Sequence, residues 1–175
     1  IPQTSTIASH LPRAVCVAFS IARARKLEVA CPWPDDAVTV CSFGDASVSH
    51  STAVGAINAA LHASYQGLPM PLLLVCEDND TGISVPTPSG WIAETYGNQP
   101  HLRYVLADGE IDAVWEAVGT AIDHVRSTRQ PAFLHLRTVR LWGHAGSAAE
   151  QTSHSLAQLA SVEARRTIPL NRFLF

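Results

Sequence analysis

Two apolar runs of the sequence are each followed by side chains that could bind a charged ligand. Asp45 follows Gly44 directly in the stretch SFGDASVSH, and Asn79 lies in the later stretch EDNDTG. Gly44 permits a tight turn, and the amides of Ala46 and Ser47, at or near the start of a helix, favour an anion such as phosphate. A carboxylate at the same place would repel that anion.

A hard divalent cation at Asp45 removes this conflict. Asp45, the side-chain oxygen of Asn79 and a backbone carbonyl in the DTG turn would form an oxygen site that suits such a cation. The cation would then bridge the protein and a diphosphate. Spacing alone leaves a second interpretation open, in which the Gly-Asp pair is only a turn and a helix cap.

Alternating apolar patterns predict the elements that must position these residues. Three helices are predicted, at residues 11–26, 51–65 and 109–129, and four strands, at residues 37–43, 70–77, 103–107 and 131–140. This alternation is typical of an α/β fold, a parallel sheet with helices on both faces. The run 37–43 holds no charged residue, which predicts a strand buried on both faces.

Composition limits the classes of function. The chain has 175 residues, 47% of them hydrophobic, which is enough for one core. Its net charge of −3 gives no basic footprint for nucleic acid. No apolar run approaches the roughly 20 residues of a membrane span. We therefore expect one soluble domain, residues 1–175, and, from the abrupt starts and stops IPQTST and NRFLF, a fragment incomplete at both ends.

Ligands of open parallel sheets bind at the carboxyl ends of the strands. The loops GDAS, EDNDTGIS and LWGHAGS should meet there. The first two resemble the thiamine diphosphate motif, which starts with Gly-Asp-Gly and closes with Asn-Asn. Six motifs in order, TSTIASHLPRAV, GDAS, AIN, CEDNDTGIS, LADGEIDAV and TVRLWGHAGS, resemble the alpha part of the E1 component of 2-oxo acid dehydrogenases, the family of the pyruvate, branched-chain and acetoin enzymes. The resemblance implies a thiamine-diphosphate-binding fold of the diphosphate-binding type.

The resemblance also implies a role for individual residues. Asp45, Asn79 and the backbone carbonyl of Thr81 match the ligands of Mg2+. Groups implied to lie against the diphosphate are Gly44, the amides of Ala46 and Ser47, and Arg140.

Three further residues match positions around the reacting end of the cofactor. Ser5 and Ile7 match residues that contact the aminopyrimidine ring. His144 matches the active-site histidine of a mobile loop, which implies a role near the thiazolium and in passing the acyl group to a lipoyl arm.

Several positions depart from the family pattern. Ala46 replaces the third motif glycine, which is tolerable if its φ is negative. Asp78 replaces the first Asn, and Asp80 stands where related chains have Gly or Arg. With Glu77, three acids crowd a loop that should meet a dianion, which opposes diphosphate binding unless they point away.

The resemblance implies oxidative decarboxylation of a 2-oxo acid and acyl transfer to lipoyl, with thiamine diphosphate and Mg2+ as cofactors. The implied partners are a beta-type E1 domain or subunit, separate or fused to this chain, and the lipoyl domain of an E2 acyltransferase. The beta part would supply the activating glutamate, so we expect the fragment alone to be inactive. We expect an oligomer in the cytoplasm or mitochondrial matrix. Two alternatives stay open: another thiamine diphosphate class, against which GHAGS and ADGEIDAV argue, and a degenerate scaffold domain.

Overall fold

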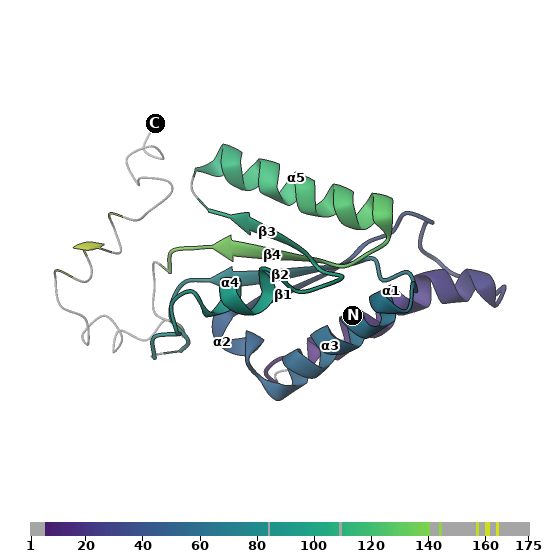
Figure 1. The fold of residues 1–175 in the computed structure, drawn as a ribbon, viewed down its shortest axis with the longest axis horizontal. Helices are drawn as coiled ribbons and strands as arrows, with labels where there is room; N and C mark the ends of the chain where they lie inside the picture. The colour runs from purple at the N-terminus through teal and green to yellow at the C-terminus, as the bar shows by residue number, and fades with distance from the viewer. Residues whose placement is uncertain are drawn as a thin grey trace.

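The computed structural model describes residues 6–83, 85–108, 110–140, 144, 157, 160, 161 and 164. Within them lies a four-stranded parallel sheet in the order β1-β2-β4-β3 (Figure 1). Its strands are β1 (Thr39–Gly44), β2 (Leu72–Asp78), β3 (Arg103–Ala107) and β4 (Ala132–Arg137). The helices are α1 (His10–Lys26), α2 (Asp45–Val48), α3 (Ser51–Tyr65), α4 (Trp91–Tyr96) and α5 (Ile111–Thr128).

The two faces of the sheet are covered by different helices (Figure 1). Alternate residues of β2 point to opposite faces, as the pleat of a strand requires. Leu72 and Leu74 pack with Phe133 in a cluster that includes residues of α1, α3 and α4. Leu73 packs with Val125 of α5 in a second cluster. The predicted α/β class, with a parallel sheet between helices, is confirmed.

Helix α1 shows how the sequence specifies such an element. Buried Leu11, Ala14, Ala18 and Ile21 recur at helical spacing and form one stripe toward the sheet. Pro12 lies in the first turn, where a missing backbone N–H does no harm. Three basic residues occupy the last turn and complement the helix dipole, namely Arg23, Arg25 and Lys26.

The prediction that strand 37–43 is buried on both faces is wrong. Val40 of β1 is 59% exposed, whereas Cys41 and Phe43 on the other face are buried. The reason is the place of β1 at one edge of the described sheet, because α5 packs mainly on β3 and β4 and less on β2. The short helices α2 and α4 were not predicted either.

The carboxyl ends of the strands form one polar edge. Strand register places Gly44 beside Glu77 and Asp78 beside Arg137, so the ends of β1, β2 and β4 lie together.

In the part of the chain that the structure describes, no helix combines the length and apolar character that a membrane span requires.

Candidate functional site

Asp45 begins α2 directly after β1, and only 5% of its surface is exposed. The hydroxyl of Thr87 donates a hydrogen bond to Asp45 Oδ2 over 2.6 Å. Burial raises the pKa of Asp45, and the nearby carboxylate of Asp78 raises it further, against the lowering effect of hydrogen bonds from Thr87 and the Ala46 amide. The surroundings of Asp45 therefore destabilise its ionised form relative to its protonated form.

The residues around Asp45 follow the sequence expectations only in part. Ala46 lies within helical α2 and is not among the positive-φ residues, so replacement of the motif glycine is tolerated as expected. The chain passes from β1 to α2 directly at Gly44, which caps the helix in an extended conformation with φ −83° and ψ 161° and so does not use the special freedom of glycine. A Cβ added to Gly44 would lie 4.0 Å from the Glu77 carbonyl oxygen, which is ordinary contact. Ser47 occupies α2 and is half-buried.

Two side chains of the loop after β2 fold back onto the backbone amides two residues ahead. Asn79 Oδ1 accepts a hydrogen bond from the Thr81 amide at 3.1 Å, and Asp78 Oδ1 accepts one from the Asp80 amide at 3.0 Å. Asp80 has a left-handed φ of 61°. These turns give Asn79 and Thr81 a defined local conformation at the end of β2.

The three acids of this loop, which the sequence predicts to oppose diphosphate binding unless they point away, have partners within the chain. Arg137 donates to Asp78 Oδ2 at 2.5 Å and to both carboxylate oxygens of Asp80, at 3.0 and 2.7 Å. Glu77 is exposed and accepts a hydrogen bond from the Ser42 hydroxyl at 2.6 Å. Two of the three charges are thus directed to an arginine.

A hydrogen-bonded chain continues from Asp78 into the sheet. His135 Nε2 lies 2.7 Å from Asp78 Oδ2, and His135 Nδ1 lies 2.6 Å from the Tyr104 hydroxyl. A neutral imidazole satisfies both contacts if Nε2–H donates to the carboxylate and Nδ1 accepts from Tyr104. Burial raises the pKa of Asp78, but the Asp80 amide, His135 and Arg137 outweigh burial, so the pKa lies below its ordinary value.

A hollow of about 470 Å³ opens beside Asp45. Trp91 stands at this hollow and donates from its indole N–H to Ser49 Oγ at 3.0 Å. The sequence patterns did not single out Thr87, which lies in the segment without periodicity between β2 and α4, or Trp91, which begins the six-residue helix α4. The residues that line the hollow are Asp45, Ala46, Ser49, Gly82, Ile83, Val85, Pro86, Thr87, Pro88, Trp91 and Ile92.

Close packing joins the first two predicted loops. A Cβ added to Gly82 would lie 3.3 Å from the Ala46 Cβ, so the segment after β2 lies against α2. Arg140, beyond the end of β4, donates to the carbonyls of Gly82 and Ile83 at 2.6 and 3.2 Å. The structure therefore brings Asp45 and Ala46 close to the backbone of residues 82–83. Arg140 is hydrogen-bonded to that backbone.

The other predicted site residues are placed less completely. Ile7 is exposed in the turn before α1, and His10 Nε2 bonds the Ser42 carbonyl at 2.8 Å, which puts this turn at the same sheet edge. His144 is an exposed turn residue. Ser5 and the neighbours of His144 at 141–143 and 145–156 lie outside the described residues.

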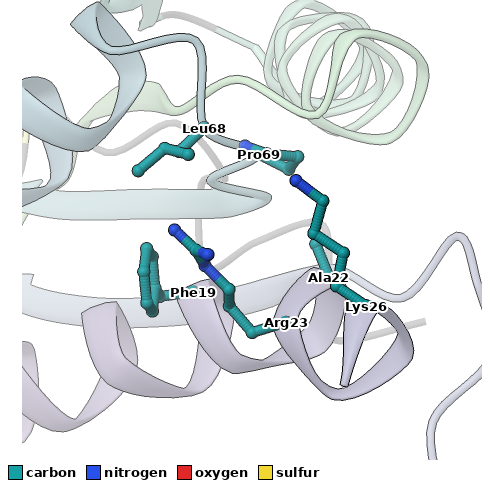
Figure 2. A pocket seen from close by; sticks show the side chains of 6 residues that line it. All are labelled: Phe19, Ala22, Arg23, Lys26, Leu68 and Pro69. Atoms are coloured by element: carbon teal, nitrogen blue, oxygen red, sulfur yellow. The ribbon is translucent and has the colours of Figure 1, made fainter. Parts of the chain in front are cut away.

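A second, smaller hollow of about 160 Å³ lies at the other end of α1 (Figure 2). Arg23 stacks over the Phe19 ring with 4.8 Å from its guanidinium carbon to the ring centroid. Leu68 and Pro69 close the opposite wall, just before β2 begins. This hollow therefore lies at the amino ends of the strands, away from Asp45.

The described residues include no group of three or more His, Cys, Asp or Glu that could hold a metal ion. The predicted site does not depend on such a group. It uses one carboxylate, from Asp45, together with the amide oxygen of Asn79 and the carbonyl of Thr81. These are all oxygen donors, which Mg2+ prefers.

Comparison with known proteins identifies the family. Residues 3–173 match the family model described as the dehydrogenase E1 component. The chain belongs to this family. The resemblance drawn from the six sequence motifs is thereby confirmed.

This E1 chain is also similar to the 2-oxoisovalerate dehydrogenase subunit alpha 2, mitochondrial, of Arabidopsis thaliana, with 28% identity over 174 residues. The match covers 97% of the chain but 34% of the relative, so the chain spans about a third of that protein.

Two solved structures share the fold. A transketolase from Pichia stipitis has a TM-score of 0.56 and 19% identity, over 77% of this chain and 20% of that one. A transketolase from Leishmania mexicana has a TM-score of 0.53 and 15% identity, with the same coverage.

Proposed function

We propose that this chain supplies the diphosphate and metal half of a thiamine diphosphate site in an E1 component that decarboxylates a 2-oxo acid. The observation that carries the proposal is the Asp45 carboxylate. It is buried at the carboxyl edge of a parallel sheet, its described hydrogen-bond donors Thr87 and Ala46 are neutral groups, and its neighbour Asp78 has the same charge. A bound divalent cation would stabilise the ionised carboxylate that burial disfavours.

The donor set available at this edge fits Mg2+. Asp45, Asn79 and the Thr81 carbonyl would be its protein ligands, and Mg2+ commonly completes its shell with substrate phosphates and water. Gly44, the amides of Ala46 and Ser47, and Arg140 would lie against the diphosphate. The metal would offset the repulsion between the diphosphate and Asp45.

When bound, thiamine diphosphate supplies a sink for the electron pair that remains when a 2-oxo acid loses CO2. The residues of this chain orient that group and control protons around it. Ser5 and Ile7 would contact the aminopyrimidine, and His144 would handle a proton near the reacting centre and assist acyl transfer to the lipoyl arm of an E2 protein. A beta-type E1 partner would provide the activating glutamate and the opposite wall of the cavity.

A degenerate scaffold is the alternative that the acid-rich loop favoured. Its main support is weakened, because Asp78 and Asp80 are paired with Arg137 and Glu77 is exposed and bonded to Ser42. The loop thus presents less uncompensated negative charge to a diphosphate than its composition suggests.

Calorimetric titration of the full-length protein, assembled with its beta-type partner, tests the proposal. We expect Mg2+-dependent binding of thiamine diphosphate, and a loss of affinity of about 100-fold or more in Asp45→Ala and in Asn79→Ala. Glu77→Ala is the matched control, because it removes an exposed carboxylate of the same loop, and its affinity should stay close to wild type. Unchanged affinity in both ligand variants, or no binding by the wild type, would refute the proposal.

A further inference from the structure

Arg137 occupies an unusual position behind the proposed metal ligands. It ends β4, directly beside Asp78 in the strand register, and its side chain reaches across to Asp80. Asn79, between the two acids, is a proposed ligand of Mg2+, and Thr81 follows Asp80. The Arg137 guanidinium therefore forms hydrogen bonds with the residues on both sides of Asn79.

We propose that Arg137 is a positioning residue that clamps the loop after β2 so that Asn79 and Thr81 face the metal and diphosphate. The expected effect of Arg137 on cofactor binding rests on the proposed function. Its expected effect on the conformation of the loop rests only on contacts within this chain.

The backbone conformation of Asp80 gives the clamp a task. Asp80 has φ 61°, in the left-handed region, which residues other than glycine adopt uncommonly, although aspartate adopts it more often than most. The Asp80 amide bonds to Asp78 Oδ1 at 3.0 Å, and its carboxylate receives a bidentate pair of hydrogen bonds from Arg137. These contacts together hold a conformation that the residue alone disfavours.

Charge gives a second reason for the clamp. Asp78 and Asp80 place two negative charges next to Asn79, and Arg137 forms an ion pair with each of them. Asp78 is also held from the opposite side by His135, in the chain of hydrogen bonds that ends at Tyr104. Arg137 therefore offsets part of the negative charge that these two carboxylates place beside Asn79.

Arg140 secures the far end of the same loop. It donates to the carbonyls of Gly82 and Ile83, so two arginines three positions apart fix the start and the end of the segment 78–83. Arg137 works through side chains and Arg140 through the backbone. The contacts of Arg137 depend on the two acids, so the acids and Arg137 should act as one unit.

Three variants of the full-length protein with its partner test this coupling. Arg137→Met removes the cation and leaves the two acids. Arg137→Lys keeps a charge but cannot make the bidentate pair with Asp80. Arg137→Met combined with Asp78→Asn and Asp80→Gly removes the cation and both acids together, and the glycine introduced by Asp80→Gly adopts a positive φ without strain.

Amide hydrogen exchange of the segment 78–83 measures the loop, and calorimetry measures thiamine diphosphate with Mg2+. In Arg137→Met we expect exchange to accelerate by about 10-fold, and affinity to fall by about 10–100-fold, as for other groups that support metal ligands. Arg137→Lys should lie between Arg137→Met and wild type. The triple variant should recover part of the affinity, because it also removes the two unpaired charges and the backbone strain at position 80 that Arg137→Met leaves behind.

Wild-type exchange and affinity in Arg137→Met would overturn the inference, as would a triple variant no better than Arg137→Met. If Arg137→Met does not fold, the comparison of Arg137→Lys with the triple variant gives the same decision. If wild type binds no cofactor, the proposed function fails, whereas the exchange experiment still decides whether Arg137 holds the loop.

Discussion

Asp45 and Asp78 are two buried aspartates at the ends of neighbouring strands, and their surroundings shift their pKa values in opposite directions. Asp78 receives hydrogen bonds from Arg137, His135 and the Asp80 amide, and its pKa is lowered despite burial. Asp45 has neutral donors and a like-charged neighbour, and its pKa is raised.

The contrast separates a carboxylate that the chain itself stabilises from one whose environment fits the proposed metal ligand. Hydrogen bonds within the chain stabilise the charge of Asp78, whereas burial and Asp78 destabilise the charge of Asp45 in the free chain. A site of this kind reduces the stability of the free protein, a common cost of function. If this view is correct, substitutions at the two positions should shift stability in opposite directions.

The largest effect should follow removal of Asp78. Asp78→Ala leaves Arg137 and His135 without their shared acceptor, which should cost about 3 kcal/mol of unfolding free energy, the low end for a broken buried pair. For a domain of this size, that is a fall in Tm of roughly 6–12 °C. Thermal unfolding without cofactor measures it.

Asp78→Asn is the matched control for this prediction. It keeps an acceptor oxygen for the Asp80 amide at similar volume, so its loss should be about 1–2 kcal/mol. Equal losses in Asp78→Ala and Asp78→Asn would mean that the hydrogen bonds to Asp78 do not stabilise the fold, and the contrast with Asp45 would be lost.

Asp45→Asn should have a smaller effect of opposite sign. Because the pKa of Asp45 is raised on folding, ionisation of Asp45 lowers stability as the pH rises through that pKa. At about pH 4 and below, where the unfolded state also binds the proton, this penalty disappears. Asp45→Asn removes the penalty, so without metal its Tm at pH 7 should exceed wild type by roughly 2–4 °C.

A pH series of thermal unfolding from acid to neutral checks the sign. The Tm advantage of Asp45→Asn should be near zero in acid and grow toward neutral pH. For Asp78, with its lowered pKa, the stabilisation is present above about pH 4 and is lost as the pH falls further. A variant Asp45→Asn that is less stable than wild type at pH 7 would contradict the assignment.

The sequence predicted the large elements because their patterns are local. Helix α3 has the predicted bounds, 51–65, and β3 has the predicted bounds, 103–107. Helix α4 was not predicted, because its six residues between Gly90 and Gly97 are too few for a helical period to appear. The exposed face of β1 escaped because strand order decides which strand lies at an edge, and no local pattern encodes that order.

The candidate site was predictable where a motif carried it and not where long-range pairing did. Asp45 and Asn79 stand out because each follows an apolar run. The contact of Arg137 with Asp78 depends on the register of β2 against β4, which the separate segments do not specify. The bond from Thr87 to Asp45 likewise joins a loop without periodicity to the start of α2.

The smallest effect in this comparison should come from Thr87. Its hydroxyl is a neutral donor to Asp45, and Thr87→Val replaces it at nearly the same volume. Because Thr87 is only half-buried, water can replace part of the lost bond, and we expect a loss of about 0.5–1 kcal/mol.

A double-mutant cycle with Asp45→Asn decides whether this bond is made to a charge. Hydrogen bonds to charged groups contribute more than bonds between neutral groups, so Thr87→Val should cost less in the Asp45→Asn background than in wild type at pH 7. Below about pH 3, under the ordinary pKa of an aspartate, a carboxyl group with a raised pKa is protonated, and the two costs should converge. Equal costs at both pH values would mean that Asp45 is already neutral at pH 7 in the free protein, and its contrast with the ionised Asp78 would then be one of protonation and not of unpaired charge.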